Sequence, residues 1–415
     1  MKTLSTAKPF WKILIKIVLV VIGLVLVFAI GVAIFKNAKI AILQAQLAPF
    51  YKTDGLPLQG ELGEIVRQEP MDLQISGGTA TRVLYRTQDS NGNNTFSSGM
   101  IFVPNNQGQN RPIVAWAHGT LGMGEACAPT RSQDPMQNIS WVNQMLENGW
   151  IVTATDYAGL GTDGIEQYLV GAGEAHDVLN SVRAARNLSG SNAGNTFAVW
   201  GHSQGGHSSL FTGSMAKSYA PELNLAGTVA SAPAAELSVM LDQQDNNVLD
   251  WVIGPEILTS WPTANDQLSA DQLTTKVGDK NYQKIADQCI DDATLDGLIR
   301  NSLKQQFFAT SPTDVPAWSE MAQAQTAPTL EPSQPLMVAE STTDLVIEPG
   351  ATALYIQRAC NAGGNLNSLW VANVQHMQIP EVIYPNVIAW INDRFNNRPN
   401  NNTCDQQLPV QPLNN

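Results

Sequence analysis

Apolar residues follow two different patterns along the chain. Residues 17–35 form one uninterrupted apolar run, IVLVVIGLVLVFAIGVAIF, which at about 1.5 Å per residue is long enough to cross a hydrocarbon core of about 30 Å. From residue 61 onward the apolar runs are short and are separated by turn residues or by stretches with helical spacing. The first pattern predicts an N-terminal transmembrane helix, and the second predicts a globular domain.

The short apolar runs predict a sheet. RVLYRT and GMIFVP flank the turn-like SNGNN and predict a hairpin. After Arg111, β-branched runs alternate with helix-like stretches such as EAHDVLNSVRAARNL and GGHSSLFTGSMAKSY. These runs are PIVAWA, WIVTATD, FAVWG, AGTVASA, PLMVAES and SLWVANV. Such alternation is typical of parallel strands covered on both faces, so we expect an α/β fold with a mostly parallel sheet.

The alternation breaks in one long stretch that is mostly helix-like and polar and carries Trp251, Trp261 and Trp318. We expect this stretch to form a mainly helical cap inserted into the α/β core, and to shape the substrate pocket. The predicted segments are a membrane anchor or signal segment over 1–35, a linker over 36–60, a core formed by 61–235 and 333–400, a cap or lid over 236–332, and a C-terminal tail over 401–415.

Lysines flank the apolar run of residues 17–35, four before it and two after it. This bias favours a cytoplasmic N-terminus with the rest of the chain outside the cytoplasm. A cleaved signal peptide is the alternative, because Gly31 and Ala33 could precede a cleavage site, although the run is longer than a usual signal sequence. The domain is therefore expected to be membrane-anchored through the N-terminal segment or, if that segment is cleaved, secreted.

Charge narrows the range of partners. Lys and Arg total 23 against 36 Asp and Glu, which gives a formal charge of -13 and a pI near 4.8. A chain of this kind is not suited to phosphate backbones, so we predict no nucleic-acid partner. No obligate protein partner is predicted either.

The four cysteines are Cys127, Cys289, Cys360 and Cys404, and their spacing matches no metal-ligand motif. An even number of cysteines in an exported chain favours disulfides, although four buried free thiols remain the alternative. The spacing does not choose among the three possible pairings. We favour Cys360 with Cys404, which would fasten the polar tail, and Cys127 with Cys289.

The sequence GHSQG, from Gly201 to Gly205, lies directly between a predicted strand and a helix-like stretch. This is the context of a nucleophile elbow, a strained turn that exposes a nucleophile and leaves space only for small residues at Gly201 and Gly205. Ser203 is therefore the candidate nucleophile. The backbone N–H of Gln204 is expected to donate to an oxyanion at the helix N-terminus.

A serine hydroxyl needs a base and an orienting acid, and in the α/β-hydrolase arrangement they follow the nucleophile in the order Asp, His. His376 is the last histidine of the chain and the only one after residue 207. Asp344 follows the strand PLMVAES, with Glu340 and Glu348 as substitutes. A helix cap for Asp344 and a surface position for His376 are the structural alternatives.

Two glycine-containing segments follow predicted strands. His118-Gly119-Thr120 comes after PIVAWA, where backbone N–H groups of Gly119 or Thr120 would complete an oxyanion hole, unless the segment is an ordinary turn. Gly159, Gly161 and Gly164 spell GxGxxG after WIVTATD, but a long irregular loop follows, so the context does not favour a dinucleotide site. We predict no metal and no organic cofactor.

The runs AHGTLGMGEACAPT, GWIVTATDYAGLGTDGIEQYLVG, WGHSQGGHSSL and ASAPA resemble the secretory lipase family of lipase A type α/β-hydrolases. The resemblance is close over residues 100–235 and looser around Asp344 and His376. It implies an α/β-hydrolase fold, a Ser203-Asp344-His376 triad, a cap after Ala235, and carboxylic esters, acylglycerols included, as substrates. The predicted N-terminal anchor departs from the family's usual secreted form.

Two other functions compete with the lipase or esterase. A serine peptidase or amidase would use the same triad on the same fold with a different pocket. A membrane-anchored binding module would keep the fold without the reaction, and the presence of Ser203, Asp344 and His376 in the proper order counts against it. Labelling by a fluorophosphonate, which requires an activated serine, separates the enzymes from the binding module.

Overall fold

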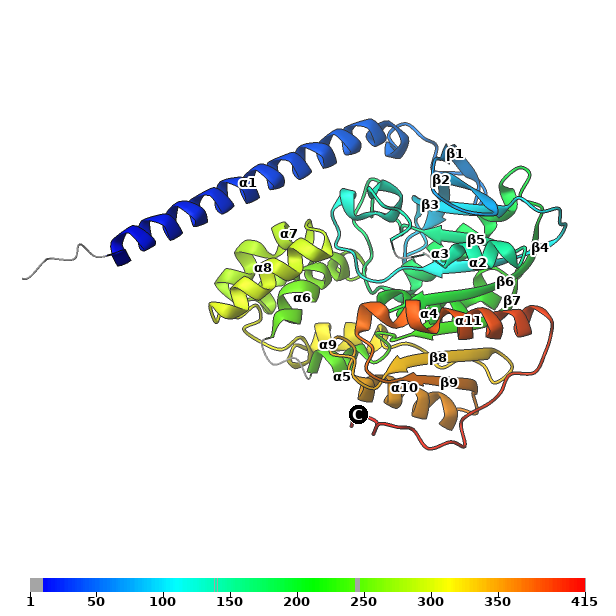
Figure 1. Cartoon of the computed structure of the whole chain (residues 1–415). Helices are drawn as coiled ribbons and strands as arrows, with labels where there is room; N and C mark the ends of the chain where they lie inside the picture. The colour runs from blue at the N-terminus through cyan, green and yellow to red at the C-terminus, as the bar shows by residue number, and fades with distance from the viewer. Residues whose placement is uncertain (1–9, 138, 140, 243–246, 415) are drawn as a thin grey trace, which may run out of the picture. The chain divides into compact units, whose positions relative to one another are not determined.

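The computed structural model describes residues 10–137, 139, 141–242 and 247–414. The chain divides into two compact units, Met1–Pro49 and Phe50–Asn415 (Figure 1). The first described element is helix α1 (Phe10–Tyr51). The predicted linker over 36–60 is thus helical as far as Tyr51.

The prediction of a transmembrane helix over residues 17–35 is not supported. These residues lie in α1, but across the described part of the chain no helix combines the length and the apolar character needed to cross a bilayer.

One sheet forms the centre of the second unit, with the strand order β1-β2-β3-β5-β4-β6-β7-β8-β9 in the described residues. Strands β4 to β9 are parallel to one another. Strands β1, β2 and β3 form one edge of the sheet, where β1 pairs antiparallel with β2, β2 with β3, and β3 with β5. The strands are β1 (Ile65–Met71), β2 (Gly78–Gln88), β3 (Asn94–Pro104), β4 (Arg111–Ala117), β5 (Ile151–Thr155), β6 (Ala193–His202), β7 (Asn224–Ser231), β8 (Pro335–Ser341) and β9 (Asn365–Val371). The predicted mostly parallel α/β sheet is confirmed.

The predicted hairpin is β2 and β3, whose register runs from Gly78 opposite Pro104 to Gln88 opposite Asn94. The sequence patterns miss β1. Its sequence, IVRQEPM, is largely polar and contains Pro70. Proline is tolerated at a sheet edge, which is where β1 lies.

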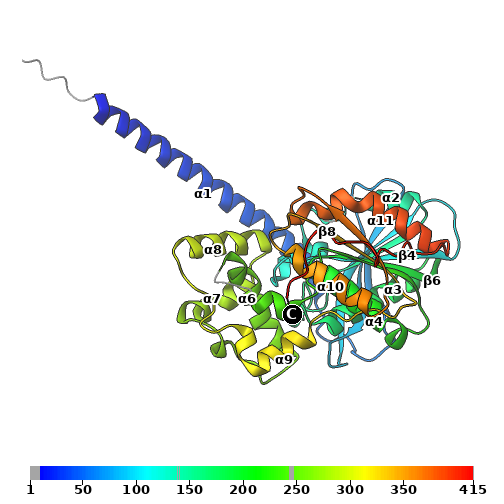
Figure 2. The same ribbon diagram turned by 90° about the horizontal axis from the view of Figure 1, so that it is seen from below.

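Helices cover both faces of the sheet (Figure 2). Helices α3 (Gly171–Asn187), α4 (Gln204–Tyr219) and α10 (Pro349–Asn361) pack against one face, and α2 (Val142–Glu147) and α11 (Ile379–Phe395) against the other. Both faces of strand β4 carry apolar side chains that helices bury. Ile113 and Ala115 belong to one hydrophobic cluster, and Val114 and Trp116 belong to a second cluster. Alternate residues of a strand point to opposite faces.

A helical segment, here called the cap, lies between β7 and β8 (Figure 1). Its helices are α5 (Leu237–Asp242), α6 (Val248–Ser260), α7 (Lys276–Ala286), α8 (Ile290–Ser302) and α9 (Pro316–Ala324). Trp251, Trp261 and Trp318 are buried within it. These side chains belong to the same buried hydrophobic cluster as Val114 and Trp116 of the core, so the cap and the core share one apolar interior.

The cap is tied to the loop that follows β4. Ile290 N–H donates to the Leu121 carbonyl (2.8 Å), and Met123 N–H donates to the Ala286 carbonyl (2.9 Å). Cys127 forms a disulfide with Cys289 across 162 residues of sequence. This predicted pairing is confirmed.

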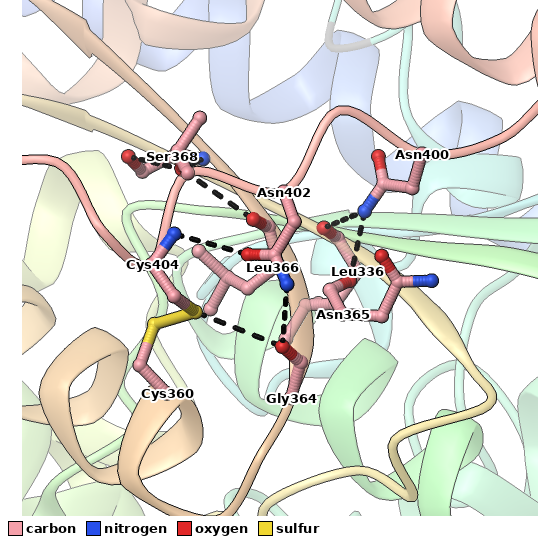
Figure 3. Close-up of a disulfide and its surroundings, with 10 residues drawn as sticks. Leu336, Cys360, Gly364, Asn365, Leu366, Ser368, Asn400, Asn402 and Cys404 are labelled. Atoms are coloured by element: carbon pink, nitrogen blue, oxygen red, sulfur yellow. Dashed lines mark hydrogen bonds between the residues drawn. A yellow bond between two sulfur atoms is a disulfide. The ribbon is translucent and has the colours of Figure 1, made fainter.

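The second predicted disulfide, Cys360–Cys404, is also confirmed (Figure 3). Beside it the tail bonds to edge strand β9: Thr403 N–H donates to the Leu366 carbonyl (2.8 Å), and the Asn400 amide donates to the Asn365 carbonyl (2.8 Å). The tail therefore satisfies backbone groups that an edge strand would otherwise leave unpaired.

Candidate active site

Ser203 lies at the turn between β6 and α4. Its backbone has φ 59° and ψ -118°, in a region that residues other than glycine rarely adopt. Ser203 N–H donates to the Ser231 carbonyl (2.9 Å), and the Ser203 carbonyl accepts from His207 N–H (3.1 Å). The strained conformation is thus held by hydrogen bonds on both sides, as a nucleophile elbow requires.

The two glycines of GHSQG occupy positions where a side chain would collide with backbone. A Cβ on Gly201 would lie 1.8 Å from the Gly205 carbonyl oxygen. A Cβ on Gly205 would lie 1.9 Å from the Ala117 carbonyl oxygen. The sharp turn around Ser203 therefore depends on both glycines.

His376 and Asp344 are in direct contact. His376 Nδ1 lies 2.6 Å from Asp344 Oδ2, and both side chains are buried. Asp344 follows β8 and His376 follows β9, so both lie beyond the carboxyl ends of parallel strands, where such sheets place functional residues. The N–H groups of Val346 (2.7 Å) and Ile347 (3.1 Å) donate to Asp344 Oδ1 and fix the carboxylate.

The two substitute acids for Asp344 lie elsewhere. Glu348 is exposed at the start of α10. Glu340 is buried and accepts hydrogen bonds from the Thr352 hydroxyl (2.6 Å) and the Ser341 N–H (2.7 Å). Burial raises the pKa of Glu340 well above its ordinary value, and the charge of Asp344 raises it further. Of the three candidate acids, Asp344 is the one whose carboxyl group contacts His376.

The candidate oxyanion donors come from two segments. Gln204 is the first residue of α4, and N–H groups of a first helical turn have no partner within the helix. A Cβ on Gly119 would lie 3.4 Å from Ser203 Cβ, so the Gly119 backbone closely approaches the turn. The Thr120 hydroxyl is engaged with the Tyr168 hydroxyl (2.9 Å). The structure thus brings all three residues close to Ser203.

These groups open onto one cavity of about 490 Å³. Its wall includes Ser203, His376, Gly119, Thr120 and Gln204. The cap supplies aliphatic side chains to the same wall: Leu237, Met240, Leu241, Val248, Leu249, Val252, Ile253 and Ile257. Among the described residues that line the cavity, the cap tryptophans are absent, so the cap shapes the pocket through α5, α6 and the start of α8 rather than through its buried Trp side chains.

The remaining histidines serve the fold. His202 packs its ring 4.5 Å from that of His376, His176 stacks 4.0 Å from Tyr219, and His118 bonds to the Gly119 carbonyl (2.8 Å). Burial lowers the pKa of His118, His176 and His202. These three rings are therefore neutral at neutral pH.

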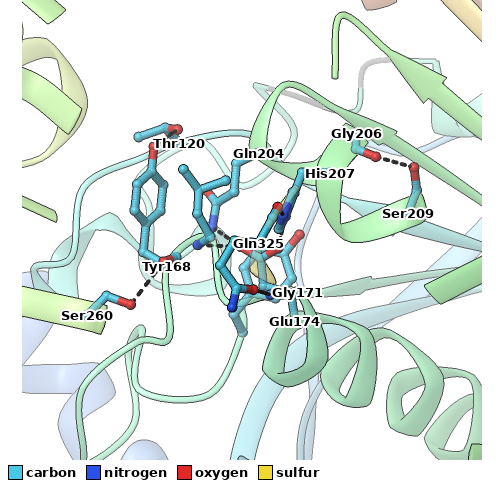
Figure 4. A network of polar contacts seen from close by, with 12 residues as sticks. Thr120, Tyr168, Gly171, Glu174, Gln204, Gly206, His207, Ser209, Ser260 and Gln325 are labelled. Carbon is cyan, nitrogen blue, oxygen red and sulfur yellow. Dashed lines mark hydrogen bonds and ion pairs between the residues drawn. The ribbon is translucent and has the colours of Figure 1, made fainter. Parts of the chain in front are cut away.

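A buried polar network lies behind the Ser203 turn, and the sequence patterns do not predict it (Figure 4). It joins Glu166, Glu174, Gln204, His207 and Gln325. Glu166 belongs to the loop that contains the GxGxxG glycines, which runs between β5 and α3 without opening a helix.

The arrangement supports nucleophilic chemistry. A hydroxyl on a strained turn, an imidazole oriented by a carboxylate and nearby backbone N–H groups are the components of acyl transfer. His376 Nε2 is the nitrogen left to exchange a proton, because Nδ1 is bound to Asp344. The aliphatic wall suits an apolar substituent on the substrate.

Known proteins resemble the chain in sequence and in fold. The sequence model of a family described as secretory lipase matches residues 133–403. A secreted triacylglycerol lipase of Malassezia globosa is 24% identical over 378 residues, which cover 84% of this chain and 79% of the relative. A probable inactive lipase of Mycobacterium tuberculosis is 22% identical over 374 residues, with 85% and 82% covered. The solved structure of Candida antarctica lipase A matches with a TM-score of 0.70 at 16% identity, with 88% of this chain and 89% of that chain covered.

Proposed function

Because the chain belongs to the secretory lipase family, we propose that it is a serine hydrolase that cleaves carboxylic esters, acylglycerols among them, through a Ser203-His376-Asp344 triad. The observation that carries the proposal is the shared cavity: the strained Ser203 and the His376-Asp344 pair line or adjoin one apolar chamber. An apolar chamber next to a nucleophile suits an ester with a hydrocarbon acyl chain.

In the first half of the reaction, His376 Nε2 takes the proton of the Ser203 hydroxyl as Oγ bonds to the ester carbonyl carbon. The carbonyl oxygen becomes an oxyanion and is bound by the N–H of Gln204 and an N–H of Gly119 or Thr120. The carbon–oxygen bond to the alcohol then breaks, and His376 donates its proton to the departing oxygen. Ser203 is left as an acyl ester.

In the second half, water takes the place of the alcohol. His376 removes a proton from the water as its oxygen bonds to the acyl carbon, and the same N–H groups bind the second oxyanion. Release of the carboxylic acid returns the proton to Ser203. Asp344 holds the ring of His376 and stabilises its positive charge throughout, and the steps require no metal or organic cofactor.

Export of the protein is part of the proposal. The Malassezia globosa relative is named a secreted lipase. Two disulfides, Cys127–Cys289 and Cys360–Cys404, suit an oxidising compartment. We therefore favour a secreted protein.

The test is hydrolysis of p-nitrophenyl esters of increasing acyl length by the full chain, with Ser203→Ala as the control. We expect turnover by the wild type and a loss of at least about 10³-fold in the variant. A fluorophosphonate should label the wild type at Ser203.

Three outcomes separate the competing functions. Labelling with ester turnover supports the hydrolase, and the acyl-length optimum distinguishes a lipase from an esterase. Labelling with turnover only of anilides or peptides would point to an amidase or peptidase. Folded wild type without labelling would place the chain with its probable inactive relative.

A further inference from the structure

The side chain of Gln204 is fully engaged by two carboxyl groups (Figure 4). Its Nε2 donates to Glu166 Oε1 (3.0 Å) and to Glu174 Oε1 (3.0 Å). An amide nitrogen has two hydrogens, so both are used. The side chain is buried. The first residue of α4 is therefore held by these two side-chain contacts as well as by its own helix.

Glu174 is the centre of this network. Its Oε1 also accepts from Leu169 N–H (3.0 Å), and its Oε2 lies 3.0 Å from His207 Nδ1. The other ring nitrogen, His207 Nε2, lies 2.8 Å from the Gln325 carbonyl. A carbonyl oxygen only accepts, so His207 Nε2 carries the hydrogen of this contact.

The side chains of Glu174 and His207 are 1% and 0% exposed, so their contact is fully enclosed. Every carboxyl oxygen of Glu174 has a partner in the network. Burial raises the pKa of Glu166 to about 8, and Glu166 therefore binds Gln204 as a neutral acceptor at neutral pH.

The network bears on catalysis through one peptide group. The peptide between Ser203 and Gln204 carries the proposed oxyanion N–H, and its plane turns only through ψ of Ser203 and φ of Gln204. Pinning the Gln204 side chain restricts the second rotation, and the hydrogen bonds at Ser203 restrict the first. An oxyanion donor is effective only when it is already aimed at the developing charge.

We propose that Glu174 is a positioning residue for the oxyanion hole, acting through the side-chain amide of Gln204. The proposal rests on the proposed function, since it concerns the same reaction.

Through His207, the network also connects Glu174 to the cap. His207 Nε2 contacts the Gln325 carbonyl, and the Gln325 amide oxygen accepts from Gly171 N–H (2.9 Å) at the start of α3. Gln325 caps the end of α9, where the chain returns from the cap.

The test compares Glu174→Gln with Asp177→Asn, which makes the same chemical change one turn farther along α3. Asp177 is also buried, but its carboxylate binds the Ala158 N–H (2.7 Å) instead of the network. The readouts are kcat, KM and the inhibition constant of an alkyl boronic acid, which bonds to Ser203 Oγ and forms an anionic tetrahedral adduct.

For Glu174→Gln we expect kcat to fall by about 10-fold to 100-fold while KM changes by less than about twofold. A single amide oxygen replaces the two carboxyl oxygens that contact Gln204 and His207, so the oxyanion donor is misaimed while the substrate contacts remain. The boronic acid should bind more weakly by the same factor as the fall in kcat. Asp177→Asn should lower the melting temperature and leave all three kinetic readouts near the wild-type values.

Gln204→Met gives a second, independent reading, since it keeps the backbone N–H and removes the amide. It should reproduce the kinetic losses of Glu174→Gln, and the double variant should lose no more than either single variant, because the two residues act in series. Wild-type kcat and boronic acid affinity in folded Glu174→Gln or Gln204→Met would overturn the proposal, as would additive losses in the double variant. Wild-type protein that fluorophosphonate fails to label would instead overturn the proposed function, and this proposal with it.

Discussion

The two sides of the Ser203 turn differ in chemistry. On the cavity side, α5 and α6 present aliphatic side chains. On the opposite side, buried carboxyl, amide and imidazole groups are joined by hydrogen bonds, and Asp344 is similarly fixed behind His376. Apolar contacts are non-directional, whereas hydrogen bonds set positions and angles. We therefore expect one set of residues to determine which acyl chains fit the cavity and another set to hold the catalytic groups in position. Substitutions can then test the two sets one at a time.

The largest effect is expected on the polar side, from Asp344→Asn. The amide would favour the wrong tautomer of His376, and kcat should fall by about 10⁴-fold with the fold intact. Steady-state kinetics together with a circular dichroism spectrum measure both properties.

Glu340→Gln is the matched control for that prediction. Glu340 is a buried carboxyl group four residues earlier, and burial raises its pKa, so an amide of the same shape is a close substitute for it. Its effect on kcat should stay below about 10-fold. If kcat fell by a similar factor in both variants, any carboxyl-to-amide substitution around the end of β8 would impair turnover, and the prediction of a specific role for Asp344 would be wrong.

An intermediate effect is expected on the apolar side, from Ile253→Trp on α6. The larger ring would fill part of the cavity, and each methylene group of the acyl chain that is excluded forfeits about 0.8 kcal/mol. Losing room for three methylenes would lower kcat/KM for long-chain esters by roughly 50-fold, while short esters should change little.

Leu298→Trp is the control for the cavity, because it adds the same ring to an exposed position of the cap, on α8. It should leave the acyl-length profile unchanged. A profile that is also unchanged in folded Ile253→Trp would remove this cavity as the acyl site.

The smallest change in turnover is expected from Glu166→Gln. This substitution should instead change the pH dependence of the free energy of unfolding. The pKa of Glu166 rises from about 4.5 to about 8 on folding, mainly because of burial, with Glu174 and Asp177 adding to the rise and Gln204 opposing it. Burial also raises the pKa of its neighbour Glu256 well above the ordinary value. The folded protein thus binds a proton that the unfolded chain releases between these two pH values.

The wild-type stability contributed by Glu166 is therefore complete below about pH 4.5 and is lost as the pH rises to about 8. Glu166→Gln removes this pH dependence. As the pH rises across that window, the free energy of unfolding of the variant should therefore increase relative to that of the wild type, by up to about 1.4 kcal/mol per pH unit. Denaturant unfolding at pH 5, 6, 7 and 8 measures the difference. Parallel curves would mean that Glu166 is not neutral in the folded protein.

The same contrast explains what the sequence could predict. Strands such as PIVAWA and FAVWG are recognisable because both of their faces are buried, and Ser203, Asp344 and His376 because their order and their place after strands are constrained. Glu166 and Glu174 carry no such signal, since their roles depend on contacts with α4 that only the folded chain creates. The transmembrane helix predicted from the apolar run of residues 17–35 is not supported, since no helix of the described residues qualifies as a membrane span.

The link between the cap and the loop after β4 bears on how such enzymes diversify. Leu121, Met123 and Cys127 are all joined to the junction between α7 and α8, and the same loop begins with Gly119 and Thr120. A cap transplanted from a relative without a cysteine at the matching position would leave Cys127 unpaired and the loop without its covalent link. Residues 119–127 and the cap, which lie far apart in the gene, therefore form one unit for building chimeras.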